Sequence, residues 1–436
     1  MKNITRLLFL LLCFTAADAR AQFQLPEIMG FSGSLDVRNN VAQYLVRPYR
    51  DRTERFRSAR TEALQMSLAM DDESDQLTLE NWADNRADIR PGSSKVKATA
   101  GVLGAQLADE TDEYTGNIAG AYGRFGAVEA EASMLQEKFN SDEYQKVAAG
   151  AGFSFGGEGM RLGLHGNMNL GTDSPAGDDE VQLANHSAGA ALALITDLYE
   201  LGATVDYVDR GMKVDSDEVK RSGPALGGQA MIKPFKGLKA ALRASFAKLS
   251  GGFTVGANEF ELAADNVELG ARAEWKLENL PLTLAVSYDR LSMNPEYTLG
   301  AASDRGETAN SLKSAGAALR LLGGRVLLGV EAQQFDLKYD VYSNGVLSGA
   351  AEMTWNAVIG GAEVWVLPGF ALRGSFQRRR ADNGASELFS NILAAGAGLK
   401  GEKLSLDLSA RVINPDIDIV NQDKYVDVKA AVAYKF

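Results

Sequence analysis

The sequence predicts an all-β fold: a transmembrane antiparallel, up-and-down β-barrel of about 18 strands, with 16 as the alternative, preceded by a short N-terminal extension that is mostly helical or irregular. Three observations predict it. From residue 95 onward, apolar and polar residues alternate at a period of two along segments of about ten to fifteen residues. Short turns and long polar loops alternate between these segments. Aromatic residues gather beside the short turns.

The first 21 residues have the three parts of an export signal. Lys2 and Arg6 are basic, Leu7 to Phe14 are apolar, and Ala19-Arg20-Ala21 has the small-residue spacing of a cleavage site. We therefore expect residues 1–21 to be a signal peptide. No later stretch approaches the roughly 18 to 20 apolar residues of a membrane helix, so the exported chain is expected to be periplasmic, secreted or a membrane barrel.

Residues 22–94 form a predicted extension whose composition differs from the rest of the chain. Dense charge between Asp51 and Arg60 would keep most of a helix in this region in contact with water. Four apolar residues recur there at helical spacing: Phe56, Ala59, Ala63 and Leu64. Two interpretations stay open. The segment is either a periplasmic or loosely ordered extension, or a plug folded into the lumen.

Residues 95–436 form the predicted barrel, and their alternation can be followed segment by segment. Three segments whose apolar residues fall on one face are Met160–Leu170, Leu269–Leu277 and Leu404–Val412. A β-sandwich would show the same alternation. Length separates the two folds, because strands of soluble domains average about five to six residues and membrane strands need about nine to eleven. A closed barrel also removes the sheet edges that so many strands would otherwise expose.

The breaks between segments give the strand count. Eight tight turns are expected at Gly123–Ala127, Phe155–Gly159, Thr196–Tyr199, Lys233–Gly237, Leu277–Pro281, Leu322–Arg325, Leu367–Phe370 and Lys400–Lys403. Nine long polar loops are expected at Asp109–Glu113, Phe139–Glu143, Gly171–Glu180, Asp209–Glu218, Ser250–Asp265, Ser292–Glu307, Asp340–Ala350, Arg380–Glu387 and Asn414–Asp423. These breaks imply about 18 strands, with both ends of the barrel on the tight-turn side.

The last fourteen residues, DKYVDVKAAVAYKF, place apolar side chains at every second position up to Tyr434 and Phe436. This stretch resembles the C-terminal strand of bacterial outer-membrane β-barrel proteins, including porins. The resemblance implies a Gram-negative outer-membrane location, recognition of Tyr434 and Phe436 by the outer-membrane assembly machinery, and lipid and lipopolysaccharide as neighbours. By analogy with general porins, a homo-oligomer is possible.

Composition excludes several functions. The net charge of -12 argues against nucleic-acid binding. The single cysteine, Cys13, lies in the predicted leader, so disulfides, thiolate metal sites and a cysteine nucleophile are not expected. His186-Ser187 is the best catalytic candidate, but alternation places the two side chains on opposite faces. We therefore expect no enzyme, no cofactor and no metal site.

The predicted inward positions include a series of charged residues. Acidic ones come from the first half of the barrel and basic ones mainly from the second: Glu129, Glu131, Glu200, Asp206, Lys239, Arg243, Arg272, Arg320, Arg373 and Arg411. Facing walls of opposite charge would orient polar solutes. The alternative is a solvated wall of mixed charge, because residues such as Glu331 break the pattern.

The function expected from this lumen is passive or weakly selective diffusion of small polar solutes. A plugged, substrate-specific uptake channel and a structural or adhesion barrel are the alternatives. A channel for apolar solutes would need many apolar inward residues, and the sequence predicts few. On the outside, Arg378 and Arg380 lie at the end of a strand, where guanidinium groups could bind lipid phosphates.

Overall fold

The structure, a computed structural model, describes residues 95–435 except 108–112, 126–127, 140–141, 157–159, 175–179, 197, 215–216, 256–257, 278, 300–301, 383–386, 401–403 and 417–424. The predicted signal peptide, the extension 22–94 and Phe436 lie outside the described residues.

The described chain is built almost entirely of strands. They are β1 (Lys95–Leu107), β2 (Glu113–Phe125), β3 (Val128–Phe139), β4 (Asp142–Gly156), β5 (Met160–Ser174), β6 (Val181–Ile195), β7 (Tyr199–Val214), β8 (Asp217–Phe235), β9 (Leu238–Val255), β10 (Asn258–Lys276), β11 (Leu282–Leu299), β12 (Ala302–Leu321), β13 (Val326–Ser343), β14 (Val346–Leu367), β15 (Phe370–Asp382), β16 (Glu387–Lys400), β17 (Leu404–Asp416) and β18 (Tyr425–Lys435). A single turn of 3₁₀ helix, η4 (Leu322–Gly324), joins β12 to β13.

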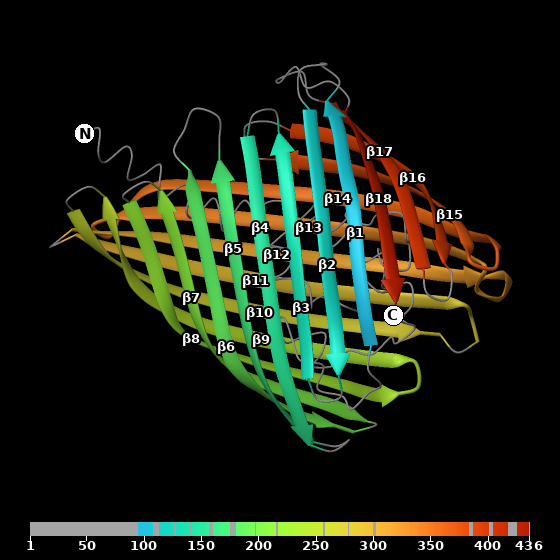
Figure 1. The fold of residues 1–436 in the computed structure, drawn as a ribbon, viewed down its shortest axis with the longest axis horizontal. Coiled ribbons are helices and arrows are strands. Elements are labelled where there is room, and N and C mark those ends of the chain that lie inside the picture. Colours follow the sequence, from blue (N-terminus) through green and yellow to red (C-terminus); the bar gives the residue numbers. More distant parts are fainter. Residues whose placement is uncertain are drawn as a thin grey trace.

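The strands form one antiparallel sheet of 18 strands, the number predicted from the turns. Each strand pairs with its neighbours in sequence, and β1 also pairs with β18. This last ladder runs from Lys97 opposite Lys435 to Leu107 opposite Tyr425. Hydrogen bonding therefore continues around the sheet from β18 back to β1, as Figure 1 shows for the blue and red strands that lie side by side. The fold is an all-β, up-and-down antiparallel barrel.

The tight turns at 196–199, 233–237, 277–281, 322–325 and 367–370 fall between strand ends, where the sequence predicts them, and residues of the other three lie outside the described ones. Between β8 and β9, Gly237 has φ 88°, and between β14 and β15, Gly369 has φ 80°. A residue with a Cβ rarely adopts such a conformation, which is why glycine occupies these positions in the two hairpin turns. Between β6 and β7, the Thr196 hydroxyl accepts a hydrogen bond from the Tyr199 N–H at 2.9 Å and stabilises that turn.

Four of the predicted long loops are wrong. The expected loops 209–218, 250–265, 292–307 and 340–350 are strand for most of their length, and β8 to β14 each contain 18 to 22 residues. The tip between β13 and β14 is only Asn344-Gly345, with φ 49° and 79°. Asn-Gly is the favoured pair for a two-residue hairpin turn. The polar composition of these stretches predicted loops, although the residues alternate as strands do.

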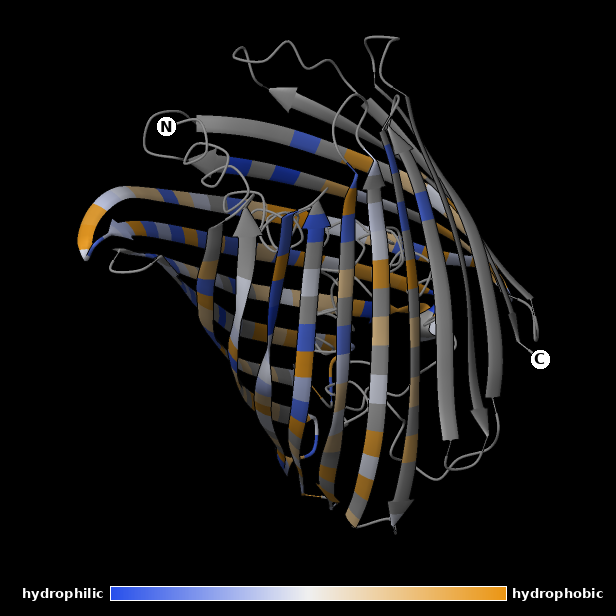
Figure 2. Ribbon diagram, turned by 60° about the vertical axis from the view of Figure 1, so that its left-hand side comes forward, coloured by the Kyte–Doolittle hydropathy of each residue, from blue (hydrophilic) through white to orange (hydrophobic). Residues whose placement is uncertain are grey.

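The two faces of the sheet differ sharply in exposure. Among the side chains that the structure describes, every residue with less than a tenth of its surface exposed lies on the inward face, whether apolar or charged. The outward face carries large exposed apolar residues instead: on β5, for example, Met160, Leu162, Leu164, Met168 and Leu170 are all exposed. Figure 2 shows the resulting alternation of hydrophobic and hydrophilic residues along the strands.

The exposed apolar side chains form a belt that starts at the tight-turn ends of the strands. On β13 the belt includes Leu328 and Val330, and on β14 it includes Val358 and Val364. Farther from the tight turns the outward face becomes polar, beginning at Gln334 on β13. The belt covers a length similar to the roughly nine to eleven residues that a tilted strand needs to cross hydrocarbon.

Candidate functional site: the inner wall

The inner wall of β12 to β15 carries buried charge. Glu331 on β13 is 1% exposed and Glu363 on β14 is fully buried. Leu327 and Phe335, on the same face of β13, are 2% and 4% exposed. A side chain that lines an open aqueous channel keeps much of its surface in contact with water. These side chains are therefore shielded from water inside the barrel.

Neutral donors hold both carboxylates in place. The Gln333 Nε2 atom donates a hydrogen bond to Glu331 Oε1 at 2.8 Å, and the Trp365 indole Nε1 donates to Glu363 Oε1 at 2.7 Å. Each donor lies two residues from its acceptor on the same strand, so period-two alternation puts both side chains on the inward face. Burying a carboxylate is costly, and these hydrogen bonds offset part of that cost.

Two of the ten predicted pore-lining residues have described side chains. Asp206 on β7 is partly buried and lies over Gly189 on β6, its cross-strand partner. A Cβ atom at Gly189 would lie 2.1 Å from Asp206 Oδ1, so glycine provides the space that this carboxylate occupies. Arg320 on β12 is also partly buried and is paired with Leu327 on β13.

For the other eight predicted residues the structure gives only the strand on which the backbone lies, and their side chains are outside the described ones. They are Glu129 and Glu131 on β3, Glu200 on β7, Lys239 and Arg243 on β9, Arg272 on β10, Arg373 on β15 and Arg411 on β17. The register places Arg373 directly opposite Glu363. The pore-lining role of all ten residues stays a prediction.

Buried carboxylates lie in the half of the barrel for which the sequence predicts mainly basic inward residues. Glu331 and Glu363 are on the same wall as Arg320, and Arg221 on β8 is buried as well. The described part of the wall therefore has mixed charge. Sequence reasoning identified Glu331 as an exception and missed Glu363 and Gln333, although alternation along β13 and β14 would have placed both inward.

The expectation of few apolar inward residues is wrong for the end of the barrel away from the tight turns. Leu249, Leu262, Phe335 and Leu337 lie on the inward face there, and none is more than 6% exposed. Tyr339 continues this surface on β13, and burial raises the pKa of its hydroxyl. Of these residues, which form an upper apolar wall, only Leu262 falls in a stretch that was assigned to a loop, so the others were missed although alternation places them inward.

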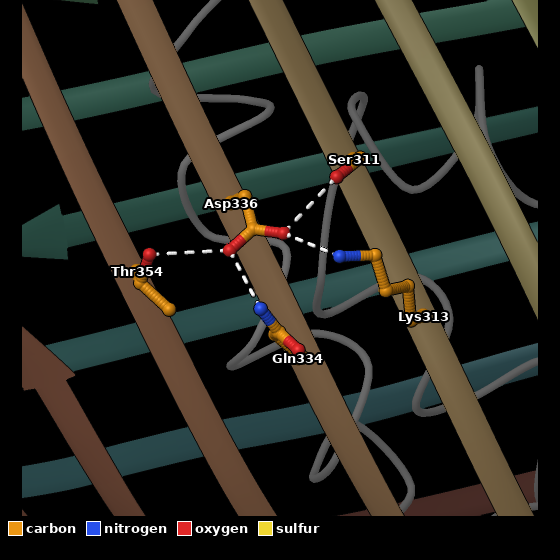
Figure 3. A network of polar contacts seen from close by, with 5 residues as sticks. All are labelled: Ser311, Lys313, Gln334, Asp336 and Thr354. Atoms are coloured by element: carbon orange, nitrogen blue, oxygen red, sulfur yellow. Dashed lines mark hydrogen bonds and ion pairs between the residues drawn. The ribbon is translucent and has the colours of Figure 1, made fainter.

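On the outward face at the same height, Asp336 is the centre of a polar network (Figure 3). Its Oδ2 atom accepts hydrogen bonds from Ser311 Oγ at 3.3 Å and Lys313 Nζ at 2.9 Å. Its Oδ1 atom accepts from Gln334 Nε2 at 2.9 Å and Thr354 Oγ1 at 3.1 Å. Ser311, Asp336 and Thr354 form one cross-strand row on β12, β13 and β14, so the sheet register builds this network.

Two opposing effects act on the Asp336 carboxyl, which lies beyond the apolar belt. Partial burial raises its pKa, whereas the hydrogen bonds from Gln334, Lys313 and Thr354 and the Lys313 charge lower it. The hydrogen bonds and the Lys313 charge together outweigh the effect of burial, so the pKa of Asp336 is lowered overall. Asp336 is thus stabilised as an anion, and both of its carboxylate oxygens accept hydrogen bonds.

The remaining sequence candidates are placed as follows. Arg378 and Arg380 on β15 are exposed on the outward face. His186 is exposed and Ser187 is partly buried, as expected for opposite faces of β6. Tyr434 lies on β18, where its backbone pairs with Leu404 and Ala98. Recognition of the C-terminal residues by assembly machinery stays a prediction.

Within the described ranges there is no group of three or more histidine, cysteine or acidic residues that could hold a metal ion. No helix in the same ranges is long and apolar enough to cross a membrane.

The fold and its outer belt define the class of the molecule: a transmembrane antiparallel β-barrel. No protein-family model matches the sequence, and a search of curated proteins finds no match.

Solved structures of bacterial proteins resemble the chain in fold. The siderophore receptor PirA from Pseudomonas aeruginosa matches with a TM-score of 0.44 and 12% identity, covering 80% of this chain and 81% of that one. The alcaligin outer-membrane receptor FauA from Bordetella pertussis matches with a TM-score of 0.45 and 10% identity, covering 80% and 76%. OccD3 (OpdP) from Pseudomonas aeruginosa matches with a TM-score of 0.41 and 11% identity, covering 81% and 94%. Similarity at this level identifies no ligand for this chain.

Proposed function

We propose that the chain is an outer-membrane channel for small polar solutes whose lumen is closed by its own N-terminal segment, residues 22–94. The observation that carries this proposal is the burial of the inner wall. Of the two transport functions expected from the sequence, steady passive diffusion requires an open lumen along β12 to β15. The burial of Glu331, Glu363 and Phe335 favours the plugged channel instead.

The strands themselves are poor candidates for the covering layer. They form the wall, and a closed barrel of about 16 to 18 strands leaves an aqueous interior unless something fills it. Described inward residues are buried from Ala371, at the tight-turn end of β15, to Leu337, near the far end of β13. A cover of this height requires a long segment of chain.

Residues 22–94 are long enough and are attached at a suitable place. They precede Lys95, the first residue of β1, which pairs with Arg124 next to the tight turn between β2 and β3. The segment therefore joins the barrel at the tight-turn end, which is the periplasmic end in this class. From there it has direct access to the lumen.

The chemistry of the segment suits the wall. Six arginines fall between residues 47 and 60, and buried carboxylates such as Glu331 and Glu363 are stabilised by cations. The predicted apolar stripe of Phe56, Ala59, Ala63 and Leu64 would match the upper apolar wall. The wall also carries polar groups suited to polar solutes, including Gln333, Thr308 and Ser375.

Planar-bilayer recording of two purified proteins tests the proposal. One begins at Gln22 and the other lacks residues 22–94. We expect the first to show little steady conductance and the second to show a large one. A heat-dependent shift on a detergent gel confirms that both barrels are folded.

Large, steady conductance from the longer protein would contradict closure by the segment. A folded but silent truncated protein would contradict a channel and favour a structural or adhesion role. Fractionation of cells expressing the full chain checks the location, with outer-membrane recovery expected.

A further inference from the structure

Strand β14 extends beyond its neighbour β15 at the end away from the tight turns. It contains 22 residues, whereas β15 contains 13. The ladder between the two strands ends at Thr354 opposite Asp382, but the ladder between β13 and β14 continues to Ser343 opposite Val346. Among the described strands, residues 346–353 therefore pair with β13 alone, and we call them the β14 edge. Figure 2 shows this hairpin at the left, where it projects past the end of β15.

The β14 edge presents unpaired backbone groups to water. In a strand with one neighbour, every second residue points its N–H and C=O groups away from that neighbour, so eight residues present about four such residues. Residues 346–352 are all exposed, with 71% of the surface of Val346 and 54% of that of Leu347 accessible. The edge also lies above the exposed apolar belt, which on β14 ends at Val358. It is therefore accessible from the aqueous side.

The sequence of the edge lacks the residues that usually prevent strand addition. Val-Leu-Ser-Gly-Ala-Ala-Glu-Met contains no proline, lysine or arginine. Its one irregularity is a register shift opposite Val341 and Tyr342, near the tip, where the Ser348 hydroxyl donates a hydrogen bond to the Val341 carbonyl oxygen at 3.1 Å. Four residues, 383–386, join β15 to β16 and span about 14 Å at most. An eight-residue edge is about 27 Å long, so this connection cannot cover it.

The two faces beside the edge have different chemistry. On the inward face, Met353 is opposite Leu337 and Ala351 is opposite Tyr339, so the upper apolar wall continues to the edge. On the outward face, the Glu352 side chain is 74% exposed, and its distance to Lys338 Nζ is 3.7 Å. A strand added at this edge would alternate between an apolar face and a face next to a carboxylate.

We propose that the β14 edge binds an extended segment of another protein by strand addition. A second strand is the partner that matches a row of alternating backbone donors and acceptors, and the side chains on its two faces then determine specificity. The chemistry beside the edge selects a segment in which apolar residues alternate with polar and basic ones. Apolar side chains would pack next to Ala351 and Met353, and a basic side chain would lie next to Glu352.

A second copy of the chain is a poorer partner for this edge. Copies in one membrane share the same orientation, so a two-fold axis between them runs along the membrane normal. Strands of such barrels are tilted by about 35 to 45° from the barrel axis. The two-fold axis makes the two β14 strands tilt in opposite directions, so they cross instead of forming a ladder.

A fluorescent eight-residue peptide, in which valine alternates with threonine and lysine, tests the proposal. Its binding to the detergent-solubilised full mature protein is measured by fluorescence anisotropy, with the signal from empty micelles subtracted. We expect saturable binding with a Kd below about 1 mM. The same peptide with two adjacent central prolines should bind at least about tenfold more weakly, because proline has no N–H group and is disfavoured in a paired strand. Absence of saturable binding, or equal binding of both peptides, would overturn the proposal.

Two variants show whether the peptide binds at this edge. E352Q should weaken its binding about two- to fivefold, because the variant removes the carboxylate next to a lysine of the peptide. E296Q is the matched control, since Glu296 is exposed on the outward face of β11, a strand that is paired on both sides at this residue. It should bind the peptide as wild type does. Equal effects of the two variants would overturn the proposal.

Native mass spectrometry of the wild-type protein distinguishes the two kinds of partner. One bound peptide per chain supports the proposal. A dimer that the peptide dissociates would assign the edge to a second copy of the chain and would overturn it. None of these results depends on whether residues 22–94 close the lumen.

Discussion

The lower and upper halves of β11 to β15 alternate with the same period but with opposite chemistry. Beside the tight turns, Val330 and Val358 point outward while Glu331 and Glu363 point inward. Farther up, Asp336 and Lys338 point outward while Phe335 and Leu337 point inward. Period two specifies a strand in both halves, but the chemistry of each face depends on what the face meets.

The inversion has a simple physical explanation. The lower outward face meets hydrocarbon, so it is apolar, and above the belt the outward face meets water, so it is polar. Inside the barrel, the buried residues include apolar ones at the upper end, such as Phe335 and Leu337, and hydrogen-bonded carboxylates lower down, such as Glu331 and Glu363. The variants below test this contrast, from the largest expected effect to the smallest.

Two phenylalanines provide the sharpest comparison. Phe335 is buried in the upper inner wall, and Phe376 is 45% exposed in the belt. We expect F335A to lower the free energy of unfolding by about 3 to 5 kcal/mol, because it leaves a cavity in a packed interior. F376A should cost less than half as much, because lipid fills the space. Denaturant unfolding in lipid vesicles measures both, and equal costs would mean that the upper wall is not packed.

A charge placed on the outward face should distinguish belt from upper surface. Val330→Arg lies in the belt and should cost about 2 to 4 kcal/mol of unfolding free energy. Ala350→Arg is the control, since Ala350 is exposed on the outward face of β14 opposite Asp340. Its expected cost is close to zero. The same vesicle assay measures both variants. If Val330→Arg unfolds with the same free energy as wild type, the belt does not contact hydrocarbon.

Gly189 tests the close packing of the inner wall. G189A would place a Cβ 2.1 Å from Asp206 Oδ1 and 2.5 Å from the Val205 carbonyl oxygen. The resulting shift of the wall should cost about 1 to 3 kcal/mol. G349A is the matched control, because no atom lies within 4 Å of its new Cβ. If both variants unfold at the same denaturant concentration, the contact between Gly189 and Asp206 does not restrict this position.

The Asp336 network should give the smallest effect, with a defined pH dependence. The native pKa of Asp336 is lowered, so its stabilising contribution is present above the unfolded-state pKa of about 3.9 and is lost as the pH falls through the native value. At pH 7, D336N should cost about 1 kcal/mol, because the network is partly exposed. The difference between wild type and variant should shrink below about pH 4. A constant difference from pH 7 to pH 2 would rule out this carboxylate as its source.

Much of the fold could be predicted from residue types alone. Strand number, the positions of the tight turns and the exposed apolar residues of β5 follow from alternation and from turn chemistry. The upper parts of β9 to β14 could not be predicted as easily. Their outward residues, such as Asp336 and Lys338, are as polar as loop residues. The apolar residues that alternate with them, Phe335 and Leu337, suggested no core because none was expected there.

Less of the candidate site could be predicted, because it depends on register. Glu331 and Gln333 are close in sequence, so alternation alone brings them together. The cross-strand pairing of Glu363 with Arg373, and of Asp336 with Ser311 and Thr354, depends on the register between neighbouring strands. A single sequence does not fix that offset.

The proposed covering of the inner wall by residues 22–94 can be tested directly, because Cys13 in the predicted leader is the only cysteine. A cysteine introduced at Ser375, which is 9% exposed on the inner face of β15, reports access to the wall, and one at Ser250, exposed on the outward face of β9, is the control. With a water-soluble maleimide, we predict rapid labelling at 250 in every protein. Labelling at 375 should occur only after residues 22–94 are deleted. Equally fast labelling at 375 in the full mature protein would contradict closure of the lumen by this segment.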